Sequence, residues 1–229
     1  MVGRGCSFAG IPYLCPNHGA MDIIYIEQSP PLHRDLCARV SNLSHTKAFG
    51  DGERVYLHEV RTARDLIGAL RAAIRDCDLA DNFMISRDNT FVHGEFNPFQ
   101  PACAKRSLWL RRKGDRQEAM IATIGWLLDN SRPTKDYEAE VPHVFSKGTL
   151  LSTLEMMDEL PTRLLHTLHF NRFGFEPQMV EDPYLDTWTW NHEPPSPVVT
   201  LGEACFKNVD CVRWIKRLEE RLREQKQDA

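Results

Sequence analysis

The choice of fold for this sequence depends on residues 90–100, TFVHGEFNPFQ. A β-branched and aromatic run ends in His93-Gly94-Glu95, and a proline and a glutamine follow shortly afterwards. A histidine and a carboxylate placed after a strand-like run occur in catalytic loops, in one half of a zinc-deaminase site and in ordinary surface turns. The segments on either side of this stretch must distinguish these three possibilities.

The composition predicts one main intracellular domain, cytoplasmic or nuclear, with at most a small appendage. The chain has 229 residues, of which 42% are hydrophobic, enough for one sizeable core. The formal net charge is −4, and charged residues of both signs are numerous. We therefore predict no nucleic-acid partner. No apolar run is long enough to span a membrane, and we expect no signal peptide at the start. Seven cysteines without regular spacing favour reduced thiols.

The residues before residue 90 predict an arm, a strand and the clearest helix of the chain. Residues 1–50 are rich in Pro, Gly, Ser and His, contain one strand-like run at 21–26, and predict an N-terminal arm or vestigial subdomain. Alternation of apolar and polar residues predicts a strand over 54–60. A helix is predicted over 63–79, with Thr62 as its N-cap. Its apolar residues share one face: Leu66, Ile67, Leu70 and Ile74.

The residues after the quoted stretch predict a β-hairpin followed by helices. SLWLRR at 107–112 and AMIATIGWLLD at 119–129 are strand-like runs joined by a short polar turn. Residues 130–147 are polar, contain two prolines and predict an irregular loop. Apolar residues at helical spacing predict helices over 148–170, and the chain ends in an amphipathic helix from about residue 210.

Two short motifs suggest zinc, but each lacks the partners that zinc requires. His93 and Glu95 match half of the zinc-deaminase signature, whereas Cys103 lies in the wrong frame for the paired thiolates. Cys15 and His18 have the spacing of one zinc half-site, and no second pair is evident. An unrelated α/β protein that binds zinc through Cys15, His18 and His93 is therefore the alternative hypothesis.

The order of the predicted elements matches the C-lobe of a protein kinase. In that lobe a helix leads into a catalytic loop. The loop holds an aspartate that acts as the catalytic base and an asparagine that binds Mg²⁺. A hairpin ending in a second Mg²⁺-binding aspartate, a polar activation segment and a helix carrying a glutamate follow. The same order is found here: helix 62–78, loop 93–100, hairpin 107–129 ending in Asp129, polar segment 130–147, and helix 148–159 with Glu155.

Four segments of the chain resemble the fungal-type protein kinases, a divergent branch of the protein-kinase-like fold. They occur in the order of the family: VRTARDLIGALRAAIRDCDLADNF (60–83), FVHGEFNPFQ (91–100), IGWLLDNSRP (124–133) and KGTLLSTLEMM (147–157). The resemblance implies an α+β fold, a kinase-like C-lobe that is mainly helical with a short β-hairpin and whose N-lobe is missing or vestigial. The C-lobe-like domain would span 51–229 and the arm 1–50.

The resemblance also implies a role for each matching residue. Glu95 would occupy the position of the catalytic base and His93 would brace the loop, while Gln100 and Asp129 would face Mg²⁺ and hence ATP. The reaction would transfer the γ-phosphoryl group of ATP to a serine or threonine of a protein. The family has aspartate and asparagine where this chain has Glu95 and Gln100, and catalysis by positioning tolerates such longer side chains poorly. We therefore expect a pseudokinase that binds a protein partner and uses ATP and Mg²⁺ only if active.

Overall fold

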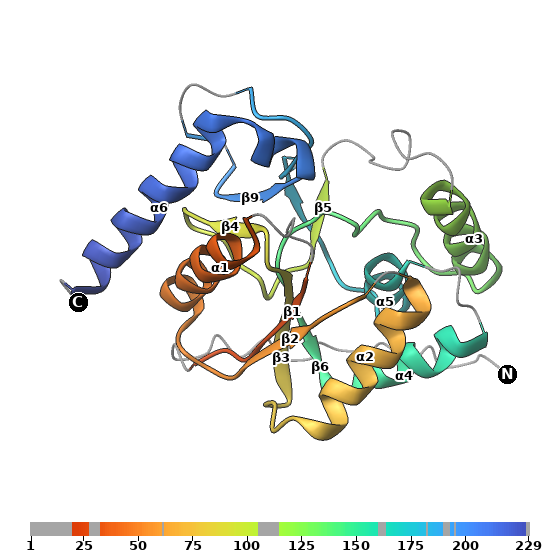
Figure 1. Ribbon diagram of the computed structural model, residues 1–229. Coiled ribbons are helices and arrows are strands. Elements are labelled where there is room, and N and C mark those ends of the chain that lie inside the picture. The colour runs from red at the N-terminus through yellow and green to blue at the C-terminus, as the bar shows by residue number, and fades with distance from the viewer. Residues whose placement is uncertain are drawn as a thin grey trace, which may run out of the picture.

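A computed structural model describes residues 20–27, 33–60, 62–104, 115–159, 164–181, 183–189, 193–194 and 196–227. The chain has an α+β fold (Figure 1). No helix in these ranges is long and apolar enough to cross a membrane. The elements in chain order are β1 Ile23–Ile26, α1 Arg34–Phe49, β2 Arg54–Leu57, α2 Ala63–Asp76, β3 Asn82–Arg87, β4 Thr90–Val92, β5 Ala102–Ala104, α3 Asp115–Asp129, β6 His143–Ser146, α4 Lys147–Glu159, α5 Leu165–Arg172, β7 Gln178–Val180, β8 Tyr184–Leu185, β9 Val198–Leu201, the 3-10 helix η3 Glu203–Lys207 and α6 Val209–Gln227.

β1 lies at the centre of the main sheet. Its strand order is β2-β1-β3-β6, in which β1 runs parallel to both neighbours and β6 runs antiparallel to β3. The sequence of β1 is IIYI and all four residues are buried, as expected of a parallel strand covered on both faces. β1 and α1 precede residue 50, whereas β2 and β3 follow it. The predicted boundary at residue 50 therefore falls within the main sheet.

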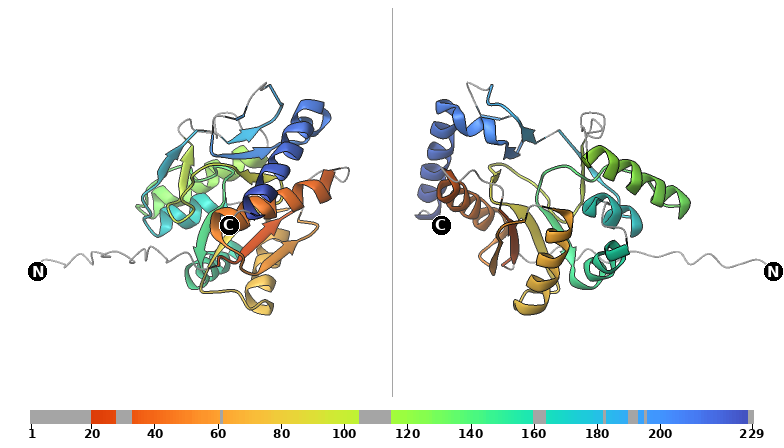
Figure 2. Two further views of the ribbon diagram at one scale, coloured as in Figure 1. Left: turned by 90° about the vertical axis from the view of Figure 1, so that its left-hand side faces the viewer. Right: turned by 45° about the vertical axis from the view of Figure 1, so that its right-hand side comes forward.

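Helices cover both faces of this sheet (Figure 2). Ile24 and Ile26 of β1 point to one face, where they pack with α2, α4 and α5. Ile23 and Tyr25 point to the other face, beside Phe49 of α1. α6 then packs on α1 through a second apolar cluster. The molecule is therefore layered, with α6 outside α1, the sheet in the middle, and α2, α4 and α5 behind it.

The strongest local signals in the sequence are confirmed. The predicted strands at 21–26 and 54–60 are present as β1 and β2, and the terminal helix is α6. α2 begins after Thr62, whose hydroxyl accepts a hydrogen bond from the Asp65 N–H at 3.1 Å. The Asp65 carboxylate accepts in return from the Thr62 N–H at 2.9 Å, which completes a capping box.

The predicted hairpin is wrong in its second strand, because Asp115–Asp129 form helix α3. Its buried residues, Met120, Thr123 and Leu127, recur at helical spacing. The Thr123 hydroxyl also accepts a hydrogen bond from the Leu164 N–H at 2.9 Å, which ties α3 to the start of α5. The run at 119–129 is almost wholly apolar, and such runs do not show the period that separates helix from strand. The first predicted strand, 107–112, lies outside the described residues.

The sequence pattern does not predict α1, because three of the five residues that this helix buries are polar. Ser41, Ser44 and His45 are all buried against the sheet. His45 Nδ1 lies 2.9 Å from the Tyr25 hydroxyl, and the Ser41 hydroxyl donates to the Thr90 carbonyl at 2.8 Å. These bonds satisfy the polar groups that burial removes from water. Burial raises the pKa of Tyr25 and lowers the pKa of His45 to about 3.

We predict that the free energy of unfolding decreases as the pH falls below about 6.5, in part because His45 stays neutral in the folded state. Its pKa is about 3 when folded and about 6.5 when unfolded, so only the unfolded chain gains this proton in between. The contribution is complete above the unfolded pKa and is lost at up to about 1.4 kcal/mol per pH unit as the pH falls toward 3.

Urea denaturation at pH 7, 6 and 5 measures this slope. The variant His45→Gln removes one titrating group and should show a shallower decrease than the wild type over the same pH range. Because slopes are compared, an overall loss of stability in the variant does not affect the test. Identical slopes for both proteins would contradict the assignment of His45 as a buried neutral histidine.

Candidate functional site

One carbonyl attaches the loop between β4 and β5 to the start of β9. The Pro197 oxygen accepts hydrogen bonds from the His93 N–H at 2.9 Å and from the Gly94 N–H at 3.2 Å. A Cβ atom on Gly94 would lie 2.9 Å from the Cβ of Pro197 and 3.3 Å from its Cα. A glycine is therefore needed for this close approach. β4 pairs antiparallel with β9, so the loop continues a ladder already formed.

His93 packs between this loop and α6. Its side chain is only 7% exposed, and its ring meets Trp214 of α6 edge-on at 5.8 Å. Nδ1 lies 3.5 Å from the Glu193 carboxylate, which also pairs with Arg221 at 2.5 Å. Burial lowers the pKa of His93 despite the nearby carboxylate. His93 is therefore a neutral packing histidine at pH 7 that joins the loop, α6 and Glu193.

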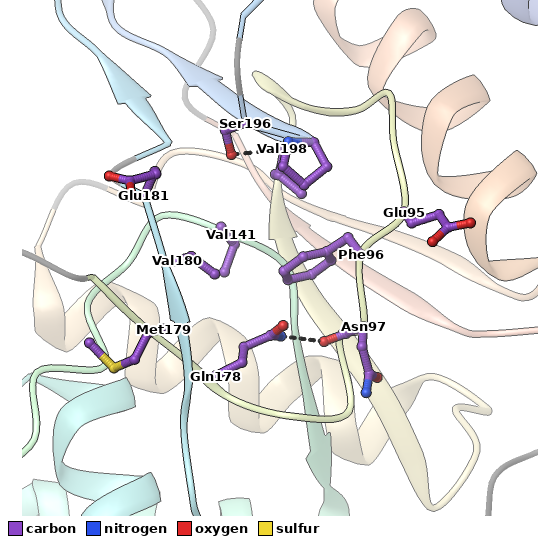
Figure 3. Close-up of a pocket in the computed structure, with 11 residues that line it drawn as sticks. Glu95, Phe96, Asn97, Val141, Gln178, Met179, Val180, Glu181, Ser196 and Val198 are labelled. Atoms are coloured by element: carbon purple, nitrogen blue, oxygen red, sulfur yellow. Dashed lines mark hydrogen bonds between the residues drawn. The ribbon is translucent and has the colours of Figure 1, made fainter.

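A pocket of about 610 Å³ lies next to this junction (Figure 3). Its walls come from three segments, Glu95–Asn97, Gln178–Glu181 and Ser196–Val198, and from Val141. Phe96 projects toward the middle of the pocket from the loop. Six of the eleven lining residues are apolar, and the other five are polar or acidic. A pocket of this size and character is typical of a binding site.

Strand β7 borders the pocket along its whole length. Residues 178–181 are consecutive and all line the pocket. Because neighbouring side chains of a strand point to opposite faces, the main chain of β7 must itself border the space. Within the part of the chain that the structure describes, β7 pairs only with β5. The Gln178 N–H donates to the Pro101 carbonyl at 2.9 Å, toward β5, so the N–H of Met179 points to the unpaired edge.

The Gln178 side chain holds two walls of the pocket together. Its Nε2 donates to the carbonyl of Asn97 at 2.5 Å and to that of Gln100 at 2.7 Å, and the bond to Asn97 is drawn in Figure 3. Both carbonyls belong to the loop between β4 and β5. The loop is thus attached to β7 at one end and to Pro197 at the other, so the pocket is largely formed before any ligand binds.

The four residues of the predicted kinase site do not come together in the structure. Glu95 lines the pocket at its margin, and Gln100 contributes a carbonyl to the contact with Gln178. His93 lies behind the loop, away from the lining. Asp129 is the last residue of α3 and is not part of the lining. Of these four residues, only Glu95 lines the pocket.

The metal predictions gain no support from the described residues. In that part of the chain no three His, Cys, Asp or Glu side chains lie close enough together to hold a metal ion. Cys103 is buried in the core, which raises the pKa of its thiol to about 12. Cys15 and His18 lie outside the described residues. Zinc binding and the Mg²⁺ roles of Gln100 and Asp129 stay predictions.

Two of the three segments that form the pocket are absent from the sequence prediction. Gln178–Glu181 lies about 80 residues, and Ser196–Val198 about 100 residues, beyond the loop that they face. The sequence contains only a weak signal for these two segments. Each includes or borders a short, mostly apolar run, QMV or VVTL, that follows a proline. Runs of this length occur in many loops and do not identify a site.

Comparison with known proteins adds no family to this description. No protein-family model matches the chain, and no curated protein matches it. The resemblance to fungal-type protein kinases stays a prediction carried by four sequence segments.

We predict that Gly94→Ala lowers the free energy of unfolding by about 1–3 kcal/mol, because the added methyl group overlaps Pro197. Gly68→Ala in α2 is the matched control, since its Cβ would meet no atom within 4 Å. Alanine there should stabilise the helix by about 0.5–1 kcal/mol. Urea denaturation measures both changes. Equal stability of Gly94→Ala and the wild type would contradict the close contact with Pro197.

Proposed function

We propose that the protein binds an extended segment of a partner protein, which adds as a strand to the open edge of β7 and places side chains in the adjoining pocket. The observation that carries this proposal is the position of β7, which has β5 on one edge and the pocket along its length. In strand addition, main-chain hydrogen bonds supply affinity and pockets for alternate side chains supply specificity. Both requirements are met at this one place.

The side chains around the pocket suit a peptide ligand. Met179 is 54% exposed on β7, and Phe96 lines the same pocket from the loop between β4 and β5. Exposed apolar residues beside a preformed pocket mark interaction sites more often than isolated exposed residues do. A volume of about 610 Å³ accommodates several side chains of an extended segment. A binding function is also the outcome expected of a pseudokinase.

Binding accounts for the pocket better than phosphoryl transfer does. A phosphotransferase needs its base and its metal ligands around one phosphate group, whereas the pocket includes Glu95 and not Asp129. Phosphoryl transfer stays a prediction of the resemblance, and ATP with Mg²⁺ tests it directly. A nucleotide present at one hundred times its Kd would stabilise the fold by about 2.7 kcal/mol.

The proposal predicts that extended peptides bind and that their free main-chain N–H groups are required. The probes are fluorescein-labelled nonapeptides in which valine alternates with lysine, threonine or glutamate. Each has a counterpart that is N-methylated at every second residue and cannot pair along that edge. We expect at least one unmodified peptide to bind, and its N-methylated form to bind at least tenfold more weakly in fluorescence anisotropy, since strand addition depends on these hydrogen bonds.

Two alanine variants locate the binding. Phe96→Ala removes the aromatic wall of the pocket and should weaken the bound peptide severalfold, because an apolar contact surface is lost. Ile121→Ala is the matched control: Ile121 is 59% exposed, but it lies on α3 outside the pocket lining. Strand addition at β7 would be wrong if no peptide bound, or if N-methylation left the affinity unchanged.

A further inference from the structure

We infer that Cys205 and Cys211 form a reversible disulfide when the protein meets hydrogen peroxide, so that η3 becomes covalently attached to α6. Both side chains lie outside the pocket lining, and the proposed binding of a peptide uses neither of them. The placement of the two thiols at the junction between η3 and α6 makes them a pair that a peroxide can oxidise.

A change of chain direction at Asn208 brings the two cysteines together. Cys205 lies in η3, and its carbonyl accepts a hydrogen bond from the Asn208 N–H at 3.0 Å. Cys211 lies in the first turn of α6, and its N–H donates to the Asn208 side chain at 3.3 Å. Asn208 therefore ends η3 and caps α6 at the same time. Both cysteine side chains are fully buried in the apolar cluster between α1 and α6.

The two thiols share a hydrogen bond that distinguishes one from the other. This bond lowers the pKa of Cys205, which accepts it, and raises the pKa of Cys211, which keeps its proton. The Cys205 thiol also donates to the Leu185 carbonyl at 3.1 Å while it is protonated. Since the thiolate is the reactive form of cysteine, Cys205 is the nucleophile of the pair and Cys211 is the second thiol that closes the disulfide.

The turn that carries Cys205 lies at the surface of the molecule. Glu203, Ala204 and Lys207 of η3 are exposed, whereas Cys205 and Phe206 face the core. A 3-10 helix has poorer hydrogen-bond geometry than an α-helix, and short surface elements of this kind open locally at low free-energy cost. Hydrogen peroxide is little larger than water, so a brief opening of η3 gives it access to the Cys205 thiol.

The oxidation proceeds in two balanced steps. The Cys205 thiolate attacks one oxygen of the peroxide, the O–O bond breaks, and hydroxide leaves and takes up a proton while Cys205 becomes a sulfenic acid. The Cys211 sulfur then attacks the Cys205 sulfur, the S–O bond breaks, and the leaving oxygen departs as water with the Cys211 proton. The two thiols together lose two electrons, which reduce the peroxide to two water molecules.

Peroxide treatment of the folded protein followed by peptide mapping tests this site. The fully reduced protein is incubated with a small molar excess of hydrogen peroxide, and the remaining thiols are then blocked with iodoacetamide in denaturant. Trypsin cleaves after Lys207, so a disulfide between the two cysteines joins two separate peptides. We expect this linked pair as the main product, and dithiothreitol should restore both thiols. Oxidation of Cys77 alone, a link between Cys37 and Cys211, or a disulfide that forms only in urea would overturn the assignment.

Three serine variants establish the roles of the thiols. In Cys211→Ser the second thiol is absent, so Cys205 should accumulate as a sulfenic acid that dimedone labels. In Cys205→Ser the nucleophile is absent, and oxidation of Cys211 should become at least about tenfold slower. Cys77→Ser is the matched control, because Cys77 is a half-buried cysteine at the end of α2 outside this cluster, and its disulfide yield should equal that of the wild type. Equal oxidation of Cys211 with and without Cys205 would contradict the pairing.

Discussion

β1 is hydrogen-bonded along both of its edges, and the positions of the neighbouring strands follow from this pairing. Ile23–Ile26 runs in register with β2 and β3, and the Asp88 N–H donates to the Ile26 carbonyl at 3.3 Å where β3 ends. Only Asp88 and Asn89 separate β3 from β4, so the place of β4 follows from that of β3. β4 in turn holds β9 and the loop that forms one wall of the pocket. The pocket is therefore attached to the main sheet through a few residues.

The local physics of each segment explains which elements the sequence predicts. α2 has an amphipathic pattern and a capping box at Thr62, so its position is encoded within its own residues. α3 carries apolar residues on nearly every side from residue 119 onward, and the hydrogen bond from the Leu164 N–H to Thr123 ties it to the start of α5. α1 buries serines and a histidine, which is stable only because Tyr25 and Thr90 supply hydrogen-bond partners from other elements. These two elements become predictable only once their neighbours are known.

The candidate site also combines a segment that the sequence pattern identifies with contacts to residues far away in the chain. His93-Gly94-Glu95 attracts notice in the sequence, and the structure does place Glu95 at a pocket. What the tripeptide does there depends on Pro197, more than one hundred residues later, whose carbonyl accepts from two of its N–H groups. A glycine at position 94 suggests a flexible loop, yet it permits a close and ordered contact. Pairing between short strands far apart in the chain leaves no periodic signal that a single sequence reveals.

In the complex that we propose, a partner segment extends the small sheet of β5 and β7 by one strand. Hydrogen–deuterium exchange of single amides, measured with and without the tightest-binding valine nonapeptide, is the decisive measurement. The Gln178 N–H is bonded to Pro101 and should be protected in both states. The Met179 N–H points to the open edge of β7, and it should exchange rapidly in the free protein and become protected on binding. Protection that appeared only on α3 or another distant element, with Met179 unchanged, would contradict the account.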